Sequence, residues 1–515
     1  MVEVLVGLIP LVLALGAFTV PIIYLILRSR LVVMSVGVVA SLTSLVLSVL
    51  IALSAFSSDA PIVFRAGGWP APVGIVYIAD KFTSTLSLIT CFTGLLIFIY
   101  SVSYITDENY PWYTALLLGV LSGILGVVLT GDLFNLFVML EVTSVSAYGL
   151  VMYYRFRANS VMSGLKYAFI GALGTTLYLL AMGLVYSVFG TLNLVDFSLR
   201  IREATSPISI QVFSIVMILA LWAFSIKSGV FPNHFWLPDA HPAAPTPISA
   251  LLSGLVVNTG VVALYKFLYL ATWSTPDQPL PPLLGEVRYI ISLMAIVMGE
   301  LSAIIGALLM YIQRDVKRLI AYSTIMNLGY LFMAAGCGTK IGVEATLLYV
   351  SIHSVAKAAL FLSVGVFIKA AKSRDLEKLA GSWRASRVAA IALALSTLTL
   401  AGTPPLPGFM AKLALYNALF EYSAPLAVLM VVSSAIGLIG YMKLFYTILL
   451  ASPTSTLVRV DVKLAKLVLV ILSTAILAAG LVFTVMPQLL FTILSSVSEQ
   501  ALNSEVYIQS VIPPR

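Results

Sequence analysis

Long stretches without a single charged residue recur along the chain, and they constrain its fold more than any other feature. The clearest cover residues 31–58, 82–106, 109–131, 167–195, 204–226, 319–339, 388–411, 422–442 and 467–498. Each is long enough to cross about 30 Å of hydrocarbon as an α-helix. Together with runs that contain one interior charge, they predict an all-α polytopic membrane protein with about fourteen transmembrane helices.

The charge balance supports the same interpretation. Charged residues make up 10% of the 515 residues, whereas in a typical soluble protein they make up about a quarter. The formal net charge is +8, and most Lys and Arg residues fall in the loops after odd-numbered predicted helices. The positive-inside rule makes those loops cytoplasmic, which puts both termini outside a multi-pass cytoplasmic membrane protein. The basic excess thus orients the chain in the lipid bilayer and requires no nucleic-acid partner.

The residues that usually hold cofactors are few and scattered. Cys91 and Cys337 lie in apolar runs far apart in the sequence, outside any iron–sulfur or disulfide pattern. The three histidines are too dispersed for a metal site. We therefore expect no metal, cofactor or catalytic centre in this chain.

Two apolar segments are interrupted beside a lone lysine. In the stretch 222–258, Lys227 is followed five residues later by Pro232, and in the stretch 400–412 a proline-rich break precedes Lys412. An ammonium group at mid-membrane costs roughly 2.5–3.5 kcal/mol on insertion scales, so it usually faces protein or a hydrated path. Interrupted helices at corresponding places in two halves indicate a transporter with internal repeats.

Three further ionisable residues lie inside apolar runs. Glu141 follows ten residues after the start of its run, and His353 and Lys357 are spaced i,i+4 on one helix face. We interpret them as groups of an ion path. The alternatives are a carboxylate paired with a lysine for packing, a Lys227 that satisfies the end of its own helix, and a structural histidine–lysine pair.

Other candidates for lining a path surround the first break. His234, Asp239 and His241 lie in the irregular polar segment after it, where His241 is as compatible with a hydrogen-bonded structural role as with proton transfer. Asn258 and Lys266 follow on the next predicted helix. Their spacing separates them by about 80° around the helix, so they need not share a face.

Several of these stretches resemble one protein family. The matching segments are FNLFVMLEVTSVSAY (134–148), KSGVFPNHFWLPDAHPAAPTPISALLSG (227–254), QRDVKRLIAYSTIMNLGY (313–330), HSVAKAALFLSVG (353–365) and AGTPPLPGFMAK (401–412). They resemble the antiporter-like membrane subunits of complex I, Mrp-type cation/proton antiporters and membrane-bound hydrogenases. The resemblance implies two inverted five-helix repeats with broken seventh and twelfth helices. We therefore expect three N-terminal helices in residues 1–110, repeats at 111–272 and 284–450, and a C-terminal helix and tail at 451–515.

The resemblance also assigns roles to the residues above. It implies that Glu141 and Lys227 interact, that His353 and Lys357 relay protons, and that Lys412 is the far-side lysine. The chain departs from the family pattern at Asn258, where many relatives place a lysine in the eighth helix. An amide cannot carry a proton at physiological pH, so either Lys266 or water bridges this position or the relay is interrupted.

The function implied is that of an ion-translocating subunit. The partners would be other membrane subunits of a complex I-like redox-driven pump, a membrane-bound hydrogenase or an Mrp-type antiporter, and the ions protons, sodium or both. As an oxidoreductase, the chain would act only as a part of such a complex, because it contains no redox motif. Two alternatives stay open: a self-sufficient secondary cation/proton transporter, and a non-conducting scaffold whose relay stops at Asn258.

Overall fold

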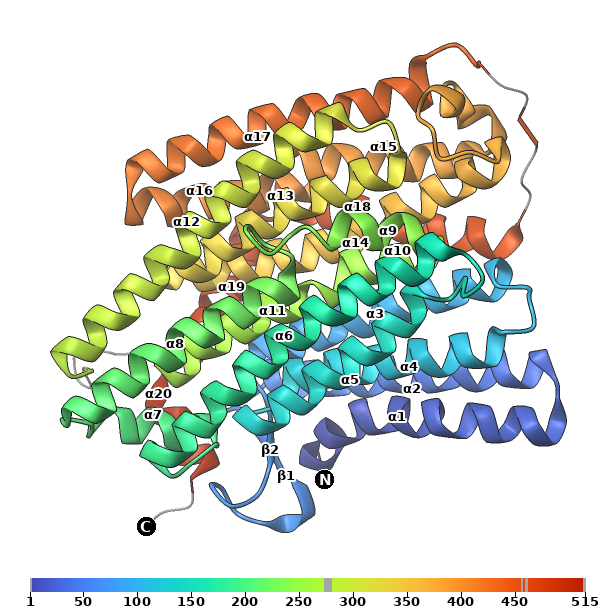
Figure 1. Ribbon diagram of the computed structural model, residues 1–515. Helices are drawn as coiled ribbons and strands as arrows, with labels where there is room; N and C mark the ends of the chain where they lie inside the picture. The colour runs from blue at the N-terminus through green and yellow to red at the C-terminus, as the bar shows by residue number, and fades with distance from the viewer. Residues whose placement is uncertain (1, 273–279, 455–456, 459–461, 513–515) are drawn as a thin grey trace.

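A bundle of long helices that run side by side makes up the computed structural model, which describes residues 2–272, 280–454, 457–458 and 462–512 (Figure 1). Within these ranges, 13 helices are long and apolar enough to cross a membrane. Eleven of them are continuous: α1 (Val2–Leu27), α2 (Arg30–Phe56), α3 (Lys81–Tyr104), α4 (Tyr110–Leu129), α5 (Leu133–Val151), α6 (Ala158–Phe189), α8 (Pro207–Ser228), α12 (Pro282–Ile312), α13 (Val316–Gly336), α14 (Lys340–Ala371) and α18 (Lys463–Val485). The polytopic all-α prediction is confirmed.

The other two spans contain π-helical turns. The span Thr246–Ala271 consists of α10 (Thr246–Leu251), the π-turn η2 (Leu252–Val256), α11 (Asn258–Tyr265) and the π-turn η3 (Lys266–Ala271). The span Ala424–Leu450 consists of α17 (Ala424–Phe445) and the π-turn η6 (Tyr446–Leu450). A π-turn inserts an extra residue and is often found at functional sites. The turns η2 and η3 flank the segment that carries Asn258 and lead into Lys266.

Both predicted helix breaks are present. The first follows α8, where Gly229 adopts a left-handed conformation (φ +64°) before the short helix α9 (Leu237–Ala243). The second separates α15 (Arg387–Ala401) from α16 (Pro407–Tyr422), with Gly402 at φ +85°. A left-handed glycine followed by prolines ends a helix because proline offers no N–H to continue it. Helices α15 and α16 together form the predicted twelfth, broken helix.

Three spans form the core of the bundle. Nearly all residues of the span Thr246–Ala271 and of α13 are buried, whereas α1, α17 and α18 are mostly exposed or partly exposed along their most apolar stretches. Helix α14 packs against α3, α10, α13, α15, α16 and α18, so it lies at the centre. Figure 1 shows α1 and α2 on one flank and α17 on the other. The apolar outer faces suit lipid. Asn258, Lys266, His353 and Lys357 lie on the inner spans, whereas Glu141, Lys227 and Lys412 lie on α5, α8 and α16.

The non-membrane elements gather mainly at one end of the bundle. An antiparallel hairpin, β1 (Ile62–Arg65) with β2 (Val76–Ala79), lies there beside α7 (Leu194–Arg202) and α20 (Ser504–Val511) (Figure 1). Arg65 donates to the carbonyl of Ser510 at 3.1 Å, which ties the hairpin to α20. The described part of the chain also has short 3₁₀ turns: η1 (Ala66–Gly68), η4 (Glu377–Leu379) and η5 (Ser382–Ala385).

The C-terminal part differs from the expected single helix and tail. Helix α18 ends at Val485, and α19 (Pro487–Leu502) starts a new direction before α20. Pro487 explains the break, because its ring prevents continuation of the preceding helix. The tail folds back: Gln500 accepts from the Lys81 amide at 2.8 Å, and Tyr507 donates to Asp80. The division of the bundle into two inverted repeats stays a prediction.

Candidate functional site

Lys227 is buried at the end of α8 and is held by neutral groups. Its side chain is 5% exposed, and Nζ donates to Ser144 Oγ on α5 at 2.7 Å and to the Gly171 carbonyl on α6 at 3.1 Å. Within the described ranges, no carboxylate forms an ion pair with this lysine. Lys227 therefore bridges α5 and α6 rather than only satisfying the end of its own helix.

Glu141 lies one helical turn before Ser144 on α5 and is partly buried. Because residues three apart share a helix face, Glu141 lies on the same side of α5 as the Lys227 contact. Its carboxylate acts on Lys227 electrostatically but does not touch it. The structure thus places Glu141 on the face of α5 that Lys227 contacts, with no hydrogen bond between the two side chains among the described residues. Asp132 has a different role, because it accepts from the Asn135 amide at 2.7 Å and caps the start of α5.

Lys357 and His353 lie on α14 in the core. Lys357 is fully buried, and its Nζ donates to Ser323 Oγ at 2.5 Å and contacts the Ile320 carbonyl at 3.5 Å. His353 is 1% exposed, and neither ring nitrogen has a hydrogen-bond partner among the described residues. The histidine borders a cavity of about 10 Å³, lined also by Tyr349, Ile352, Thr399, Leu400, Gly408 and Ala411. This volume is about the smallest that holds one water molecule, and the cavity lies beside the second helix break.

Lys412 reaches back across the second break. Its Nζ donates to the carbonyl of Ala401, the last residue of α15, at 2.9 Å and to Ser434 Oγ on α17 at 2.7 Å. It also lies 5.5 Å from the centre of the Tyr330 ring, within cation–π range. Gly402 leaves the necessary space, since a Cβ there would lie 2.7 Å from Lys412 Cδ. The carbonyl freed by the break thus finds a side-chain partner.

A series of polar and aromatic contacts around α13 leads from Lys357 to Lys412, and the sequence alone did not reveal it. Lys357 binds Ser323, and Asn327 Nδ2 donates to the Ser323 carbonyl. The Asn327 amide also contacts Tyr441 Oη at 2.8 Å and accepts from Tyr349 Oη at 2.7 Å. The Tyr349 ring packs edge-on against Tyr330, 6.0 Å between centres, and Tyr330 faces Lys412. The i,i+4 spacing of Ser323 and Asn327 in an otherwise apolar helix was the available signal.

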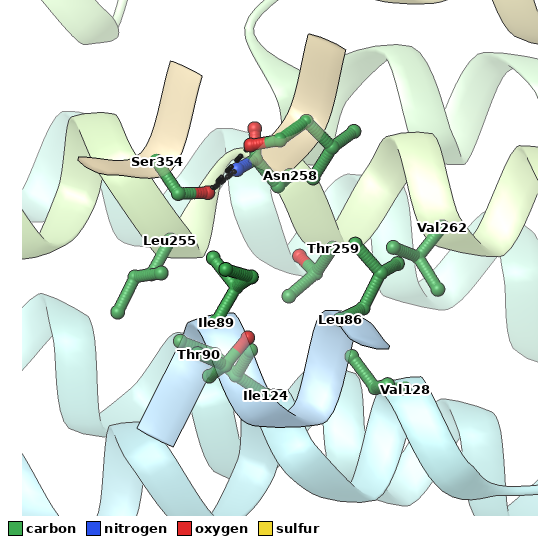
Figure 2. A pocket seen from close by; sticks show the side chains of 11 residues that line it. Leu86, Ile89, Thr90, Ile124, Val128, Leu255, Asn258, Thr259, Val262 and Ser354 are labelled. Atoms are coloured by element: carbon green, nitrogen blue, oxygen red, sulfur yellow. Dashed lines mark hydrogen bonds between the residues drawn. The ribbon is translucent and has the colours of Figure 1, made fainter. Parts of the chain in front are cut away.

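Asn258 occupies the position between the two halves. Its Nδ2 donates to the Gly254 carbonyl at 2.7 Å and to Ser354 Oγ on α14 at 3.0 Å, while Oδ1 has no partner in the part of the chain that the structure describes (Figure 2). It borders a cavity of about 10 Å³ between α3, α4, α11 and α14. Two residues later, Gly260 packs on Ser228, next to Lys227. Asn258 thus lies between the Lys227 and Lys357 sites.

Lys266 does not fill the gap at Asn258. It is 1% exposed, and its Nζ donates to the Thr130 carbonyl at the end of α4, next to the hairpin end of the bundle. The carboxylate of Asp80 acts on it electrostatically. Lys266 and Asn258 thus have separate partners, which leaves water as the candidate for a bridge across Asn258.

The residues in the segment after the first break have different roles. Asp239 pairs with Lys166 on α6 at 2.6 Å and with Arg318 on α13 at 2.5 Å. Burial alone would raise the pKa of Asp239, but hydrogen bonds and charge from these two cations lower it below its usual value. Asp239 therefore ties the first half to the second at the start of α9.

The two histidines of this segment differ in their surroundings. His241 is fully buried, stacks on Phe361 at 4.9 Å, and has no partner at either ring nitrogen within the described ranges. His234 is partly buried, and the centre of its ring lies 5.8 Å from the centre of the Phe231 ring. A further buried cation, Lys317, donates to the Ala244 carbonyl at 2.8 Å and to Ser249 Oγ at 3.1 Å, close to the segment of His241. The sequence alone places Lys317 among the loop charges.

Within the described part of the chain, no group of three His, Cys, Asp or Glu side chains could hold a metal ion. The arrangement instead offers buried ammonium groups, imidazoles, hydroxyls and water-sized cavities. Such groups can hold and exchange protons at mid-membrane depth.

Comparisons with known proteins agree with this geometry. Residues 130–437 match the family model described as NADH:quinone oxidoreductase/Mrp antiporter, TM. The chain is 30% identical over 462 residues to a Na(+)/H(+) antiporter subunit of Alkalihalophilus pseudofirmus, covering 87% of this chain and 88% of that one. It is 30% identical over 377 residues to a subunit of the NADH-quinone oxidoreductase of Desulforudis audaxviator, covering 72% of each.

A solved structure extends the match to the whole fold. The chain superposes with a TM-score of 0.89 and 25% identity on a chain of the membrane-bound sulfane sulfur reductase, an archaeal respiratory membrane complex, covering 99% of this chain and 100% of that one. The broken helices and buried lysines described above lie within or close to the matched family region. This multi-pass membrane protein therefore belongs to the NADH:quinone oxidoreductase/Mrp antiporter transmembrane family.

Proposed function

We propose that this chain moves protons across the cytoplasmic membrane as the antiporter-like subunit of a larger membrane complex. The path would run from Glu141 and Lys227, past Asn258, through His353 and Lys357, to Lys412. Partner subunits or a sodium gradient would supply the energy. Both termini would lie outside, and no cofactor would be bound by this chain.

One observation carries the proposal: Lys227, Lys357 and Lys412 lie inside the bundle, and none forms an ion pair within the described residues. Lys227 and Lys357 are buried and Lys412 is half-buried, and charges so placed without a counter-charge are unfavourable, so a structural role alone does not account for the three of them. Lysine is suited to the task because burial and a nearby acid change its proton affinity readily. The similar proteins are subunits of a Na(+)/H(+) antiporter and of an NADH-quinone oxidoreductase, which supports assembly with other membrane subunits.

Transport by the purified assembly tests the proposal. The complex that contains Lys227→Ala should assemble normally but lose coupled proton movement in liposomes with an entrapped pH dye. Lys443→Ala is the matched control, because Lys443 binds the Tyr311 and Gln313 carbonyls at the end of α12, away from the path. Wild-type proton movement in Lys227→Ala would contradict the proposal and favour a scaffold. Purification of an active homomer without partner subunits would favour a self-sufficient transporter.

A further inference from the structure

Glu300 is a buried acid that the path above does not use. It is 5% exposed, and neither carboxylate oxygen has a hydrogen-bond partner among the residues that the structure describes. At 1.5 Å per residue it lies about 18 Å from the C-terminal end of α12, well inside the membrane. An ionised carboxylate left bare in an apolar interior is strongly unfavourable, so such a group requires a proton, a cation or water.

The close packing of α12 on α13 positions this acid. Gly299 lies against the backbone of α13, where an added Cβ would be 2.5 Å from the Gly329 carbonyl. The next residues, Glu300 and Tyr330, are neighbours across this contact, and the Glu300 charge acts on the Tyr330 hydroxyl. Substitution of either glycine would separate the helices. The sequence therefore keeps Glu300 close to Tyr330.

Tyr330 and two serines lead from Glu300 to Lys412. The Tyr330 Oη lies 3.5 Å from Ser433 Oγ on α17, and Lys412 Nζ donates to the adjacent Ser434. Lys412 also lies over the Tyr330 ring. These hydroxyls thus link the surroundings of Tyr330 with Lys412.

The other ionisable groups on the helices around α12 point elsewhere. On α17, Tyr441 binds Asn327, and Lys443 binds backbone carbonyls at the end of α12. On α8, Lys227 faces α5 and α6. The Glu300 charge acts on Tyr330, and Tyr330 in turn contacts Ser433 and Lys412, so the link from Glu300 to Lys412 runs through Tyr330.

We propose that Glu300 is a proton-binding site of the second half that exchanges a proton with Lys412 through the Tyr330–Ser433 hydroxyls and water. This inference rests on the proposed proton-moving function. When Lys412 releases its proton, the ammonium becomes a neutral amine and the Glu300 carboxylate becomes a neutral acid; the reverse step restores both. The acid would thus do for Lys412 what Glu141 does for Lys227, from a different helix.

Chemical labelling and transport together test the assignment in the intact complex. Dicyclohexylcarbodiimide modifies protonated carboxyl groups in apolar surroundings, and mass spectrometry identifies the modified residue. We expect Glu300 to be labelled, with less labelling as the pH rises and no protection by sodium. In Lys412→Ala, the pH at which half of Glu300 is labelled should shift by about one unit, the size of a moderate charge interaction.

Transport by Glu300→Gln completes the test. We expect about a tenfold lower rate and an altered pH profile, because the amide keeps the shape but cannot take a proton. Ser292→Ala removes another buried polar group of α12 and is the matched control, which should behave as wild type. A wild-type rate and pH profile in Glu300→Gln, a labelling profile indifferent to Lys412→Ala, or protection of Glu300 by sodium would overturn the assignment. If the wild-type complex moved no protons, the proposed function would fail. The labelling of Glu300 and its response to Lys412→Ala would still test the proton exchange between Glu300 and Lys412.

Discussion

At the first break, Lys227 lies before the interruption and donates to neighbouring helices; at the second, Lys412 lies after it and donates to the carbonyl that the break sets free. Both helices end in a left-handed glycine followed by prolines, so the local device is the same. The lysines differ in what surrounds them. Lys227 is buried among neutral groups, and Lys412 is partly exposed and lies against a tyrosine.

The two halves also differ in continuity. From Lys357 to Lys412, hydrogen bonds lead through Ser323 and Asn327 to Tyr349, and ring contacts of Tyr349 with Tyr330 and of Tyr330 with Lys412 complete the series. From Lys227 toward Lys357, the residue in between is Asn258, with a water-sized cavity beside it. In the proposed path, the second half therefore offers fixed side chains, while passage between the halves depends on water.

The largest effect is expected at the start of the continuous series. Lys357→Ala should lower proton transport about a hundredfold, the scale on which a positioned proton-transfer group acts. Liposome assays of the assembled complex measure it. Ser363→Ala is the control, because Ser363 lies on the same helix and donates to the Leu360 carbonyl of that helix. A rate near that of wild type in Lys357→Ala would mean that the polar series is structural.

The next effect concerns the acid of the first half. Glu141→Gln removes the charge that acts on Lys227 without removing a hydrogen bond to it, so we expect about a tenfold slower turnover and a changed pH optimum. The rate is followed across a pH series. Glu344→Gln serves as the control, since Glu344 accepts a hydrogen bond from Ser498 near the start of α14. Unchanged rate and optimum would make Glu141 a packing residue.

A smaller effect, in the opposite direction, tests the gap between the halves. Asn258→Lys supplies a group that can carry a proton where the amide cannot, so we expect a several-fold faster turnover. Asn258→Leu should not accelerate transport, because it adds no ionisable group. Measured side by side, equal or lower rates in both variants would show that Asn258 does not limit the path.

The smallest effect is on stability. Asp239→Asn breaks the two ion pairs that join the halves, and because their side chains are partly exposed we expect a loss of roughly 0.5–1 kcal/mol. The pKa of Asp239 is lowered in the folded protein, so its contribution is present above the usual aspartate pKa of about 3.9 and is lost as the pH falls through the folded value. Melting curves of the two proteins should therefore converge in acid. Glu499→Gln, which breaks the exposed ion pair with Lys340, is the comparison variant. A difference in melting temperature between wild type and Asp239→Asn that does not change with pH would contradict this account.

The membrane spans, both breaks and the buried lysines could be predicted without a structure. These features are local: a run of apolar residues must cover its own backbone polar groups as a helix, and a glycine–proline break interrupts that helix wherever it lies. The cost of an ionisable group in such a run is also local, which is why Lys227, Lys357 and Lys412 could be recognised from the residues around them.

The packing of the helices decided which side chains contact one another. The hydrogen bonds of Lys227 go to Ser144 and Gly171, while Glu141 acts on it only electrostatically, and Lys166 pairs with Asp239. The polar series on α13 and the bare carboxylate of Glu300 could not be predicted either, because small rotations and glycine contacts between helices set them. Contacts between helices depend on how their surfaces interlock, and that information is spread over residues distant in the chain.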